Sequence, residues 1–337
     1  MPSKDPTAIA SGKRSELTLL ARIRDRAAHF SKRNSSLRLG IGDDCALLRL
    51  SPGEELAVTT DLSVAGRHFQ LHWHPAQAIG HRTLARGLSD LAAMGARPVA
   101  AFLSLGLPGG LTGSWLDQFL DGLFALAEAY SVPLAGGDLS ESPIAVADIV
   151  LTGAVRRGKA LLRSGAHPDD LLYVTGTLGG AAAALARLKR LAKTTSGARS
   201  LPGRLERSLA PHLYPQPRVA QGLWLARKPL ATAAIDLSDG LSTDLAHLCQ
   251  ESAVAAEIDA DALPVDAAAT LAEALHGGED YELLFTAAPS ARIPRSIAGV
   301  PVTRIGRILR VRGRPQIALI TARGSEPLRP HGWEHFS

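Results

Sequence analysis

Three long segments of the chain carry apolar residues at helical spacing, which predicts amphipathic helices. The first begins at residue 15, and its apolar positions are Leu17, Leu20, Ile23 and Ala27. The second covers residues 75–94 and ends before Gly95, a residue type that commonly follows the last turn of a helix. The third covers residues 115–130. Residues 1–14 are polar and lack this pattern, so we expect them to form a loose tail.

Shorter uninterrupted apolar runs, bounded by glycine, proline or polar residues, predict buried strands. In the first half of the chain these strands are expected at 56–60, at 99–105 and as a pair within 144–155. The alternation then starts again, with an alanine-rich helix after the first strand and strands expected at 171–174, 231–237, 283–285 and 302–308. The repetition predicts an α/β protein with mixed sheets in two domains, 15–155 and 156–337.

Residues 187–208 differ from the rest of the second half in composition. This segment carries seven Lys or Arg residues against one acidic residue, with Ser, Gly and Pro interspersed. Such charge runs are usually solvated, so we expect an exposed linker between two helices and assign it no function.

The overall composition is that of a globular protein, with 46% apolar and 20% charged residues. The formal net charge of +5 suits anionic substrates but is too small and dispersed for a nucleic-acid-binding surface. Cys45 and Cys249 form neither a CxxC pair nor a disulfide framework, which favours a reducing compartment. No signal-peptide pattern or membrane-spanning apolar stretch is found. We therefore expect a cytoplasmic protein that binds neither nucleic acid nor membrane.

Aspartates concentrate at predicted strand ends and in glycine-containing turns. They are Asp43 and Asp44 after a Gly-Ile-Gly turn, Asp61 at a strand end, Asp138 after two glycines, Asp236 and Asp239 around Ser238, and Asp90 on a helix. Any one of them alone is typical of a turn or a helix cap. The repetition of an apolar strand, then Gly, Thr or Ser, then Asp instead indicates a cation, because crowded carboxylates repel one another.

The chemistry of these ligands narrows the choice of cation. Hard oxygen ligands without neighbouring His or Cys favour Mg²⁺ or Ca²⁺ over zinc, and the absence of EF-hand spacing disfavours a calcium loop. Because Mg²⁺ usually takes only one or two protein carboxylates, several scattered aspartates indicate several Mg²⁺ ions bound together with a polyphosphate.

Two common phosphate-binding signatures are absent from the sequence. There is no GxxxxGK[ST] loop, which excludes a P-loop enzyme, and the protein-kinase motifs are missing. The glycine-rich segment 176–180 follows a predicted strand and precedes a helix, so either a phosphate cradle or tight strand–helix packing explains it.

Eight blocks carry a resemblance to a known family. In order they begin at Gly40 (GIGDDCA), Thr59 (TTD, followed by GRHF), Leu88 (LSDLAAMG), Gly136 (GGD), Arg163 (RSGA), Ile235 (IDLSDGL) and Gly277 (GGEDYEL), and they end with Trp333. Together they resemble the thiamine-monophosphate kinases, which belong to the ATP-binding superfamily that includes aminoimidazole ribonucleotide synthetase. The likeness extends from about residue 15 to 336.

This resemblance implies a fold, a partner and a set of site residues. It implies a two-domain aminoimidazole ribonucleotide synthetase-like fold, a homodimer formed through the N-terminal sheet, and ATP bound near the dimer interface. The implied magnesium ligands are Asp44, Thr59, Thr60, Asp61, Asp90, Asp138, Asp236 and Asp239. The implied ATP contacts are Gly137, Asp138, Arg163 and Ser238, and the implied thiamine contacts are His68, Glu279 and Trp333.

Chemistry supports the roles of Arg163, Trp333 and Glu279, whose carboxylate would pair with the thiazolium cation or with the aminopyrimidine, without excluding simpler roles. The guanidinium of Arg163 suits phosphate but equally suits an ordinary surface position. The indole of Trp333 would stack on a cationic thiazolium ring, although a single Trp is more often a packing residue. His68 alone is typical of a hydrogen-bonded structural histidine.

The implied reaction is the transfer of a phosphoryl group from ATP to thiamine monophosphate, which gives ADP and thiamine diphosphate. A phosphate monoester with a second pKa near ~6 is already ionised at neutral pH, so we expect no catalytic general base. The difficulty is the repulsion between two anions, which several Mg²⁺ ions would cancel for direct in-line transfer. Two alternatives are an enzyme of the same superfamily with another acceptor and a non-catalytic nucleotide-binding homologue.

Overall fold

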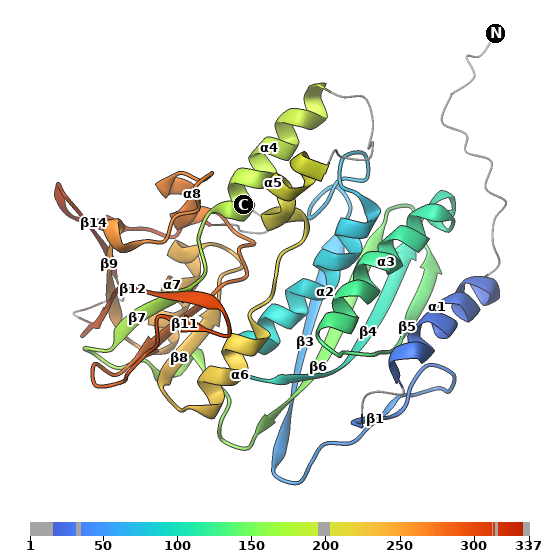
Figure 1. Ribbon diagram of the computed structural model, residues 1–337, viewed down its shortest axis with the longest axis horizontal. Helices are drawn as coiled ribbons and strands as arrows, with labels where there is room; N and C mark the ends of the chain where they lie inside the picture. Colours follow the sequence, from blue (N-terminus) through green and yellow to red (C-terminus); the bar gives the residue numbers. More distant parts are fainter. Residues whose placement is uncertain (1–15, 32–34, 195–202, 312, 314–315, 333–337) are drawn as a thin grey trace.

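The computed structural model describes residues 16–31, 35–194, 203–311, 313 and 316–332, and it shows two halves, each built on a β-sheet (Figure 1). The helices are α1 Glu16–Ser31, α2 Ala76–Ala93, α3 Ser114–Ala129, α4 Gly180–Thr194, α5 Gly203–Leu213, α6 Val219–Arg227, α7 Leu241–Glu251 and α8 Leu271–His276. The strands of the first half are β1 Leu37–Leu39, β2 Leu47–Leu48, β3 Glu54–Val64, β4 Arg97–Leu107, β5 Leu134–Glu141 and β6 Val146–Arg156. Those of the second half are β7 Leu171–Thr175, β8 Ala231–Asp236, β9 Ala255–Asp259, β10 Leu283–Ala287, β11 Ser296–Ile297, β12 Val300–Leu309, β13 Ile317–Thr321 and β14 Gly324–Leu328.

The sheet of the first half has four strands in the order β3-β6-β4-β5. Only the β4–β5 pair is parallel. Helices α2 and α3 cover one face of this sheet (Figure 1). The two helices approach closely because each places a glycine against the other. A Cβ atom on Gly80 would lie 1.8 Å from the carbonyl oxygen of Phe119, and one on Gly122 would lie 1.8 Å from that of Gln77.

The sheet of the second half has eight strands in the order β14-β13-β9-β12-β7-β10-β8, with β11 paired to β12. Its neighbours are antiparallel except β13 and β9. None of the helices in the described part of the chain is long and apolar enough to cross a lipid bilayer.

The two halves share part of one apolar core. The core of the first half continues into Leu225 on α6, Ala234 on β8 and Phe285 on β10. Helix α2 is buried on nearly all sides, since the first sheet, α3, α6 and β8 all pack against it. Polar residues of α2 are therefore held firmly at the junction of the halves.

Most of the predicted elements are confirmed, but two aspartates lie elsewhere than predicted. Strand β3 does not end at Asp61, because it pairs with β6 along its full length up to Val64. Asp138 lies within strand β5 and not in a glycine turn. Gly137 suits this strand because its φ is +147° and a Cβ atom would lie 1.9 Å from the carbonyl oxygen of Leu103.

Two further predictions of local structure were wrong. The pair of strands predicted within 144–155 is one strand, β6, which begins at Val146, lies between β3 and β4 and bonds to both. The prediction of a linker over 187–208 fails at both ends, since α4 continues to Thr194 and α5 begins at Gly203, whereas Arg187, Lys189, Arg190, Lys193 and Arg207 are exposed as expected. Leu188 is buried where the two helices pack together, which explains why the helices extend into this charged segment. The predicted tail 1–14 lies outside the described residues.

Candidate active site

A cavity of ≈ 550 Å³ opens at the junction of the two halves. Seven predicted site residues line it, namely Asp61, His68, Asp90, Asp236, Ser238, Asp239 and Glu279. They come from β3, the loop after it, α2, the end of β8 and the loop before β10. Segments distant in the sequence thus meet at one cavity.

Three carboxylates of the cavity lie close enough to influence one another. Burial raises the pKa of Asp61 and the pKa of Asp90 to about 6. The negative charge of Asp90 raises the pKa of Asp61 further, and the negative charge of Asp236 raises that of Asp90. Burial also raises the pKa of Asp236, which is 3% exposed, while a 2.7 Å hydrogen bond from the Ser89 hydroxyl opposes this rise. Placing three acids together in a partly desolvated site is unfavourable unless a cation binds there.

The two predicted threonine ligands are oriented differently. The hydroxyl of Thr59 donates a short hydrogen bond to Asp90. Thr60 follows it on β3, where side chains alternate between the two faces of the sheet, and it is exposed on the face away from α2. The structure therefore places Thr59 against Asp90, which lines the cavity, and leaves Thr60 on the open face of the sheet.

The predicted phosphate ligand Arg163 lies in a short 3₁₀ turn, Arg163–Gly165, and is exposed. It is close enough to the cavity for its positive charge to lower the pKa of both Asp90 and Asp236, against the larger effect of burial.

Glu279 lies in a strained segment of the chain. Glu279 and Tyr281 both have left-handed backbones, with φ of +69° and +50°. Non-glycine residues pay about 1–3 kcal/mol for such conformations, which persist only when their surroundings enforce them. Here the amides of Glu279 and Tyr281 bond to the carbonyl oxygens of Ser238 (2.8 Å) and Leu237 (2.9 Å). The two loops that carry Ser238 and Glu279 are thereby fixed side by side.

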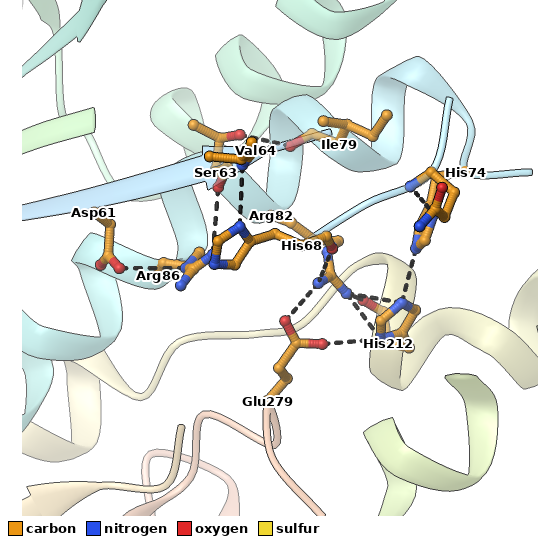
Figure 2. Close-up of polar contacts among 12 residues, drawn as sticks. Asp61, Ser63, Val64, His68, His74, Ile79, Arg82, Arg86, His212 and Glu279 are labelled. Carbon is orange, nitrogen blue, oxygen red and sulfur yellow. Dashed lines mark hydrogen bonds and ion pairs between the residues drawn. The ribbon is translucent and has the colours of Figure 1, made fainter. Parts of the chain in front are cut away.

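The Glu279 carboxylate contacts a buried cation and a buried histidine (Figure 2). Arg82 Nη2 donates to Glu279 Oε1 at 2.6 Å, and His212 Nδ1 lies 3.2 Å from Glu279 Oε2. Burial alone would raise the pKa of Glu279, but the charge of Arg82 and the bond from His212 outweigh it and hold this pKa far below its usual range. Glu279 is therefore an ionised acceptor at the cavity wall.

A second group of predicted ligands lines a different cavity, of ≈ 460 Å³. Asp44, Gly137 and Asp138 belong to it, together with residues from α1 and β4. Within the described ranges, no three His, Cys, Asp or Glu side chains are gathered closely enough to hold a metal ion together. The predicted thiamine contact Trp333 lies outside the described residues.

Comparisons with known proteins identify the family. Residues 42–155 match the family described as AIR synthase related protein, N-terminal domain, and residues 167–314 match the corresponding C-terminal domain. The chain is 42% identical to the thiamine-monophosphate kinase of Salmonella typhimurium over 307 residues, which cover 87% of this chain and 90% of that protein. The thiamine-monophosphate kinase of Escherichia coli K12 is 41% identical over 339 residues, covering 96% and 98%. This chain belongs to the thiamine-monophosphate kinase family.

Solved structures agree with this assignment. A thiamine-monophosphate kinase from Stenotrophomonas maltophilia K279a superposes with a TM-score of 0.77 at 41% identity, covering 90% of this chain and 96% of that one. The structure described as AaThiL complexed with AMPPCP and TMP gives 0.74 at 29% identity, covering 95% and 97%. The hydrogenase maturation protein HypE in complex with ATP shares the fold, with 0.71 at 18% identity. The predicted family and two-domain fold class are thus confirmed.

This member of the thiamine-monophosphate kinase family also has site residues that the sequence analysis missed. Arg86 lines the larger cavity, with Nε 3.3 Å from Asp61 Oδ1 and Nη1 3.4 Å from the Ser63 hydroxyl (Figure 2). Arg82 and His212 hold Glu279. The one local signal for the two arginines is their spacing on α2, since Arg82 and Arg86 lie eight and four residues before Asp90 and therefore share a helix face with it. No local pattern marks His212.

The structure also decides the open question about the glycine-rich segment 176–180 in this kinase-family chain. The amides of Gly179 and Ala181, at the start of α4, donate to the two carboxylate oxygens of Asp280 at 2.6 and 3.1 Å. The anion position at this helix end is therefore filled by the protein's own Asp280, which favours the packing interpretation over a phosphate cradle.

Proposed function

We propose that this protein transfers the γ-phosphoryl group of ATP to thiamine monophosphate and so forms ADP and thiamine diphosphate. The observation that carries the proposal is the larger cavity, which combines three interacting carboxylates with an ionised Glu279. Its relatives of 41–42% identity over most of the chain are thiamine-monophosphate kinases, and AaThiL was solved as a complex with AMPPCP and TMP. Both are in keeping with an ATP-dependent kinase.

Two kinds of lining residue suit the two parts of the acceptor substrate. Glu279 would accept a hydrogen bond from the aminopyrimidine or pair with the thiazolium cation, with His68 and Trp333 as further thiamine contacts. The three interacting carboxylates, Asp61, Asp90 and Asp236, would face the phosphates through bound cations. Ser238 and Arg163 are proposed ATP contacts, together with Gly137 and Asp138 from the second cavity.

The donor set fits Mg²⁺. Asp61, Asp90 and Asp236 are hard oxygen donors without a neighbouring thiolate. Their pKa values are raised because burial disfavours the ionised carboxylates, and a bound cation would stabilise the ionised forms. The further proposed ligands are Asp44, Thr59, Asp138 and Asp239, with Thr60 able to contribute only its backbone oxygen, because its side chain lies on the open face of the sheet. When bound, Mg²⁺ would neutralise the phosphates and stabilise the charge that develops during in-line transfer.

The chain's own residues would perform the remaining tasks. The phosphate monoester is ionised at neutral pH, so no side chain needs to remove a proton from it. Arg163 would bind a phosphate oxygen through its planar donors, which match phosphate geometry. The residues on the walls would orient the acceptor phosphate for attack and exclude water.

Phosphorus NMR of the purified protein with ATP, Mg²⁺ and thiamine monophosphate tests the proposal. We expect the two resonances of a diphosphate ester to grow in step with ADP and to be absent without Mg²⁺. Conversion of ATP to ADP and free phosphate with the acceptor unchanged would instead indicate an enzyme of the superfamily with another acceptor. A folded protein that leaves ATP unchanged would support the non-catalytic alternative.

We also propose a homodimer formed through the open face of the first sheet. Leu56, Val58 and Leu62 project from β3 on the face away from α2, and each is about half exposed, at 50%, 57% and 51%. A row of large apolar side chains on an edge strand favours burial against a partner. Light scattering after size exclusion should give twice the chain mass for the wild type and a smaller mass for Val58→Glu. A monomeric wild type would reject the proposal.

The division into domains and the location of the protein remain proposals of the same kind. The two family matches, 42–155 and 167–314, are separated near residue 155, which supports domains over 15–155 and 156–337. Cys45 and Cys249 are both free thiols, in keeping with a reducing compartment such as the cytoplasm.

A further inference from the structure

Arg82, His74 and His212 form a buried polar cluster behind Glu279 (Figure 2). They are 5%, 2% and 1% exposed, so their side chains have little access to solvent. Arg82 and His74 belong to the first half of the chain, whereas His212 and Glu279 belong to the second. The cluster therefore joins α2 and the loop before it to α5 and the loop that carries Glu279.

A backbone hydrogen bond determines which ring nitrogen of His74 carries the proton. The backbone amide of Gln70 donates to His74 Nδ1 at 3.0 Å, and an amide cannot accept a hydrogen bond in return. His74 Nδ1 must therefore be unprotonated. Burial, reinforced by the nearby charge of Arg82, lowers the pKa of His74 to about 2, so the ring is neutral and carries its proton on Nε2.

This arrangement determines the proton of His212 in turn. His74 Nε2 lies 3.0 Å from His212 Nε2, so the protonated His74 donates and His212 Nε2 accepts. Burial and Arg82 lower the pKa of His212 to about 4, so its single proton lies on Nδ1, which faces Glu279 Oε2 at 3.2 Å. In the other tautomer His212 Nδ1 would accept from Arg82 Nη1, 2.8 Å away, but the lone pair of Nδ1 would then face the Glu279 carboxylate and the proton on Nε2 would face that of His74.

Arg82 completes the arrangement. Its Nη2 donates to the other carboxylate oxygen of Glu279, and its Nη1 donates to the carbonyl oxygen of His212 at 2.6 Å. Each oxygen of Glu279 thus receives one donor from the buried side. The side chain of Glu279 is 25% exposed, which leaves the remaining lone pairs toward the cavity that it lines.

We propose that Arg82, His74 and His212 are positioning residues which hold Glu279 ionised and in one orientation for a cationic or amino group of the acceptor substrate. This inference rests on the proposed function for the identity of the acceptor. The direction of donation runs from the Gln70 amide through His74 and His212 to the carboxylate. Although His74 and His212 also border the cavity, they are almost fully buried, and the role proposed for each of the three side chains is exerted through Glu279.

Two substitutions of His74 separate this role from simple packing. His74→Leu fills the space but removes the donor to His212, whereas the amide of His74→Gln can still donate. We expect His74→Leu to raise the KM for thiamine monophosphate roughly 10-fold and to leave the KM for ATP within about twofold of wild type. The magnitude is the lower limit of the effect seen when a residue that hydrogen-bonds to a metal ligand is removed. His74→Gln should recover most of this loss. His247→Leu, on the exposed side of α7, is the matched control and should leave both constants unchanged.

Nitrogen NMR of the histidine rings in the wild-type protein tests the same proposal without turnover. We expect His74 to carry its proton on Nε2 and His212 on Nδ1 between pH 6 and 8. A charged His74, the opposite tautomer in either ring, or equal rises of both KM values in the two His74 variants would overturn the proposal. A wild type that shows the expected tautomers but does not phosphorylate thiamine monophosphate would contradict the proposed function and leave the arrangement of Glu279 intact.

Discussion

The hydroxyl of Ser89 on helix α2 donates a 2.7 Å hydrogen bond to Asp236 at the end of strand β8. Ser89 is 0% exposed and Asp236 3%, and 147 positions in the sequence separate them. The bond joins the helix that carries Asp90 to the strand that carries Asp236. The relative position of two proposed magnesium ligands therefore depends on it.

Ser89→Ala should destabilise the protein and reduce its turnover. The substitution leaves a buried carboxylate oxygen without its donor, which costs about 1–3 kcal/mol. In the wild type the hydrogen bond from Ser89 lowers the pKa of Asp236, so this pKa should rise further in Ser89→Ala. Urea unfolding of Ser89→Ala beside Ser325→Ala, an exposed serine on β14, measures the loss. Equal stability of the two variants would show that the bond contributes nothing.

Arg86 should control the ionisation of Asp61. Burial raises the pKa of Asp61 to about 6, and the Arg86 guanidinium, 3.3 Å away, is the main effect that opposes this rise. In the metal-free protein, Arg86→Met should therefore raise the pKa of Asp61 above that of the wild type, which carboxyl-carbon NMR would measure. Arg97→Met is the control, because Arg97 pairs with Glu54 at the start of β3. An unchanged titration in Arg86→Met would reject the assignment.

The sequence predicted the elements of the fold better than their ends. Helix α2 was predicted nearly to the residue, because a regular apolar pattern is closed by Gly95. The end of β3 was misplaced, because Asp61 was taken as a strand terminator. In the structure Asp61 shares a face with Thr59 and continues the pairing with β6, so hydrogen bonds to a distant strand decide where β3 ends.

The candidate site was predicted through its motifs and missed where it depends on tertiary contacts. Asp90 and Asp236 stand in short blocks that resemble a family, so they were named in advance. Arg82 and His212 stand outside the predicted ligand set, and their importance arises only because α2 and α5 bring them to Glu279. Likewise, the exposure of Thr60 follows from strand alternation, which a motif does not reveal.

Asp90→Asn should abolish most turnover while the fold is retained. The Thr59 hydroxyl can still donate to the amide oxygen of the new side chain, so local structure should persist. Loss of one carboxylate from the proposed metal site should cost several kcal/mol of transition-state stabilisation, or at least about 100-fold in kcat. Asp261→Asn, an exposed position, is the control. Turnover like that of the wild type in a folded Asp90→Asn protein would reject the role of Asp90.

The same variant should change the pH dependence of stability without metal. The pKa of Asp90 is about 6 in the folded protein against 3.8 for an ordinary carboxyl, so ionised Asp90 disfavours the folded state above pH 6 and the penalty disappears on acidification. Asparagine has no such penalty. Relative to the wild type, Asp90→Asn should therefore gain about 1–2 kcal/mol between pH 5 and pH 7.5. Urea unfolding at both values measures this, and a constant difference would contradict it.

The buried histidines should produce a pH dependence of the opposite sign. The folded-state pKa is about 2 for His74 and about 4 for His212, both below the ordinary value of 6.5. As the pH falls below 6.5, these histidines bind protons in the unfolded chain but stay neutral in the folded protein. Each histidine therefore lowers the free energy of unfolding by up to about 1.4 kcal/mol per pH unit. His74→Gln removes one of these sites and should lose less stability than the wild type between pH 7 and pH 5. His247→Gln, exposed on α7, should follow the wild type. The same acid-induced loss in His74→Gln and in the wild type would mean that His74 binds a proton as readily in the folded protein as in the unfolded chain, and this would contradict a pKa lowered by burial.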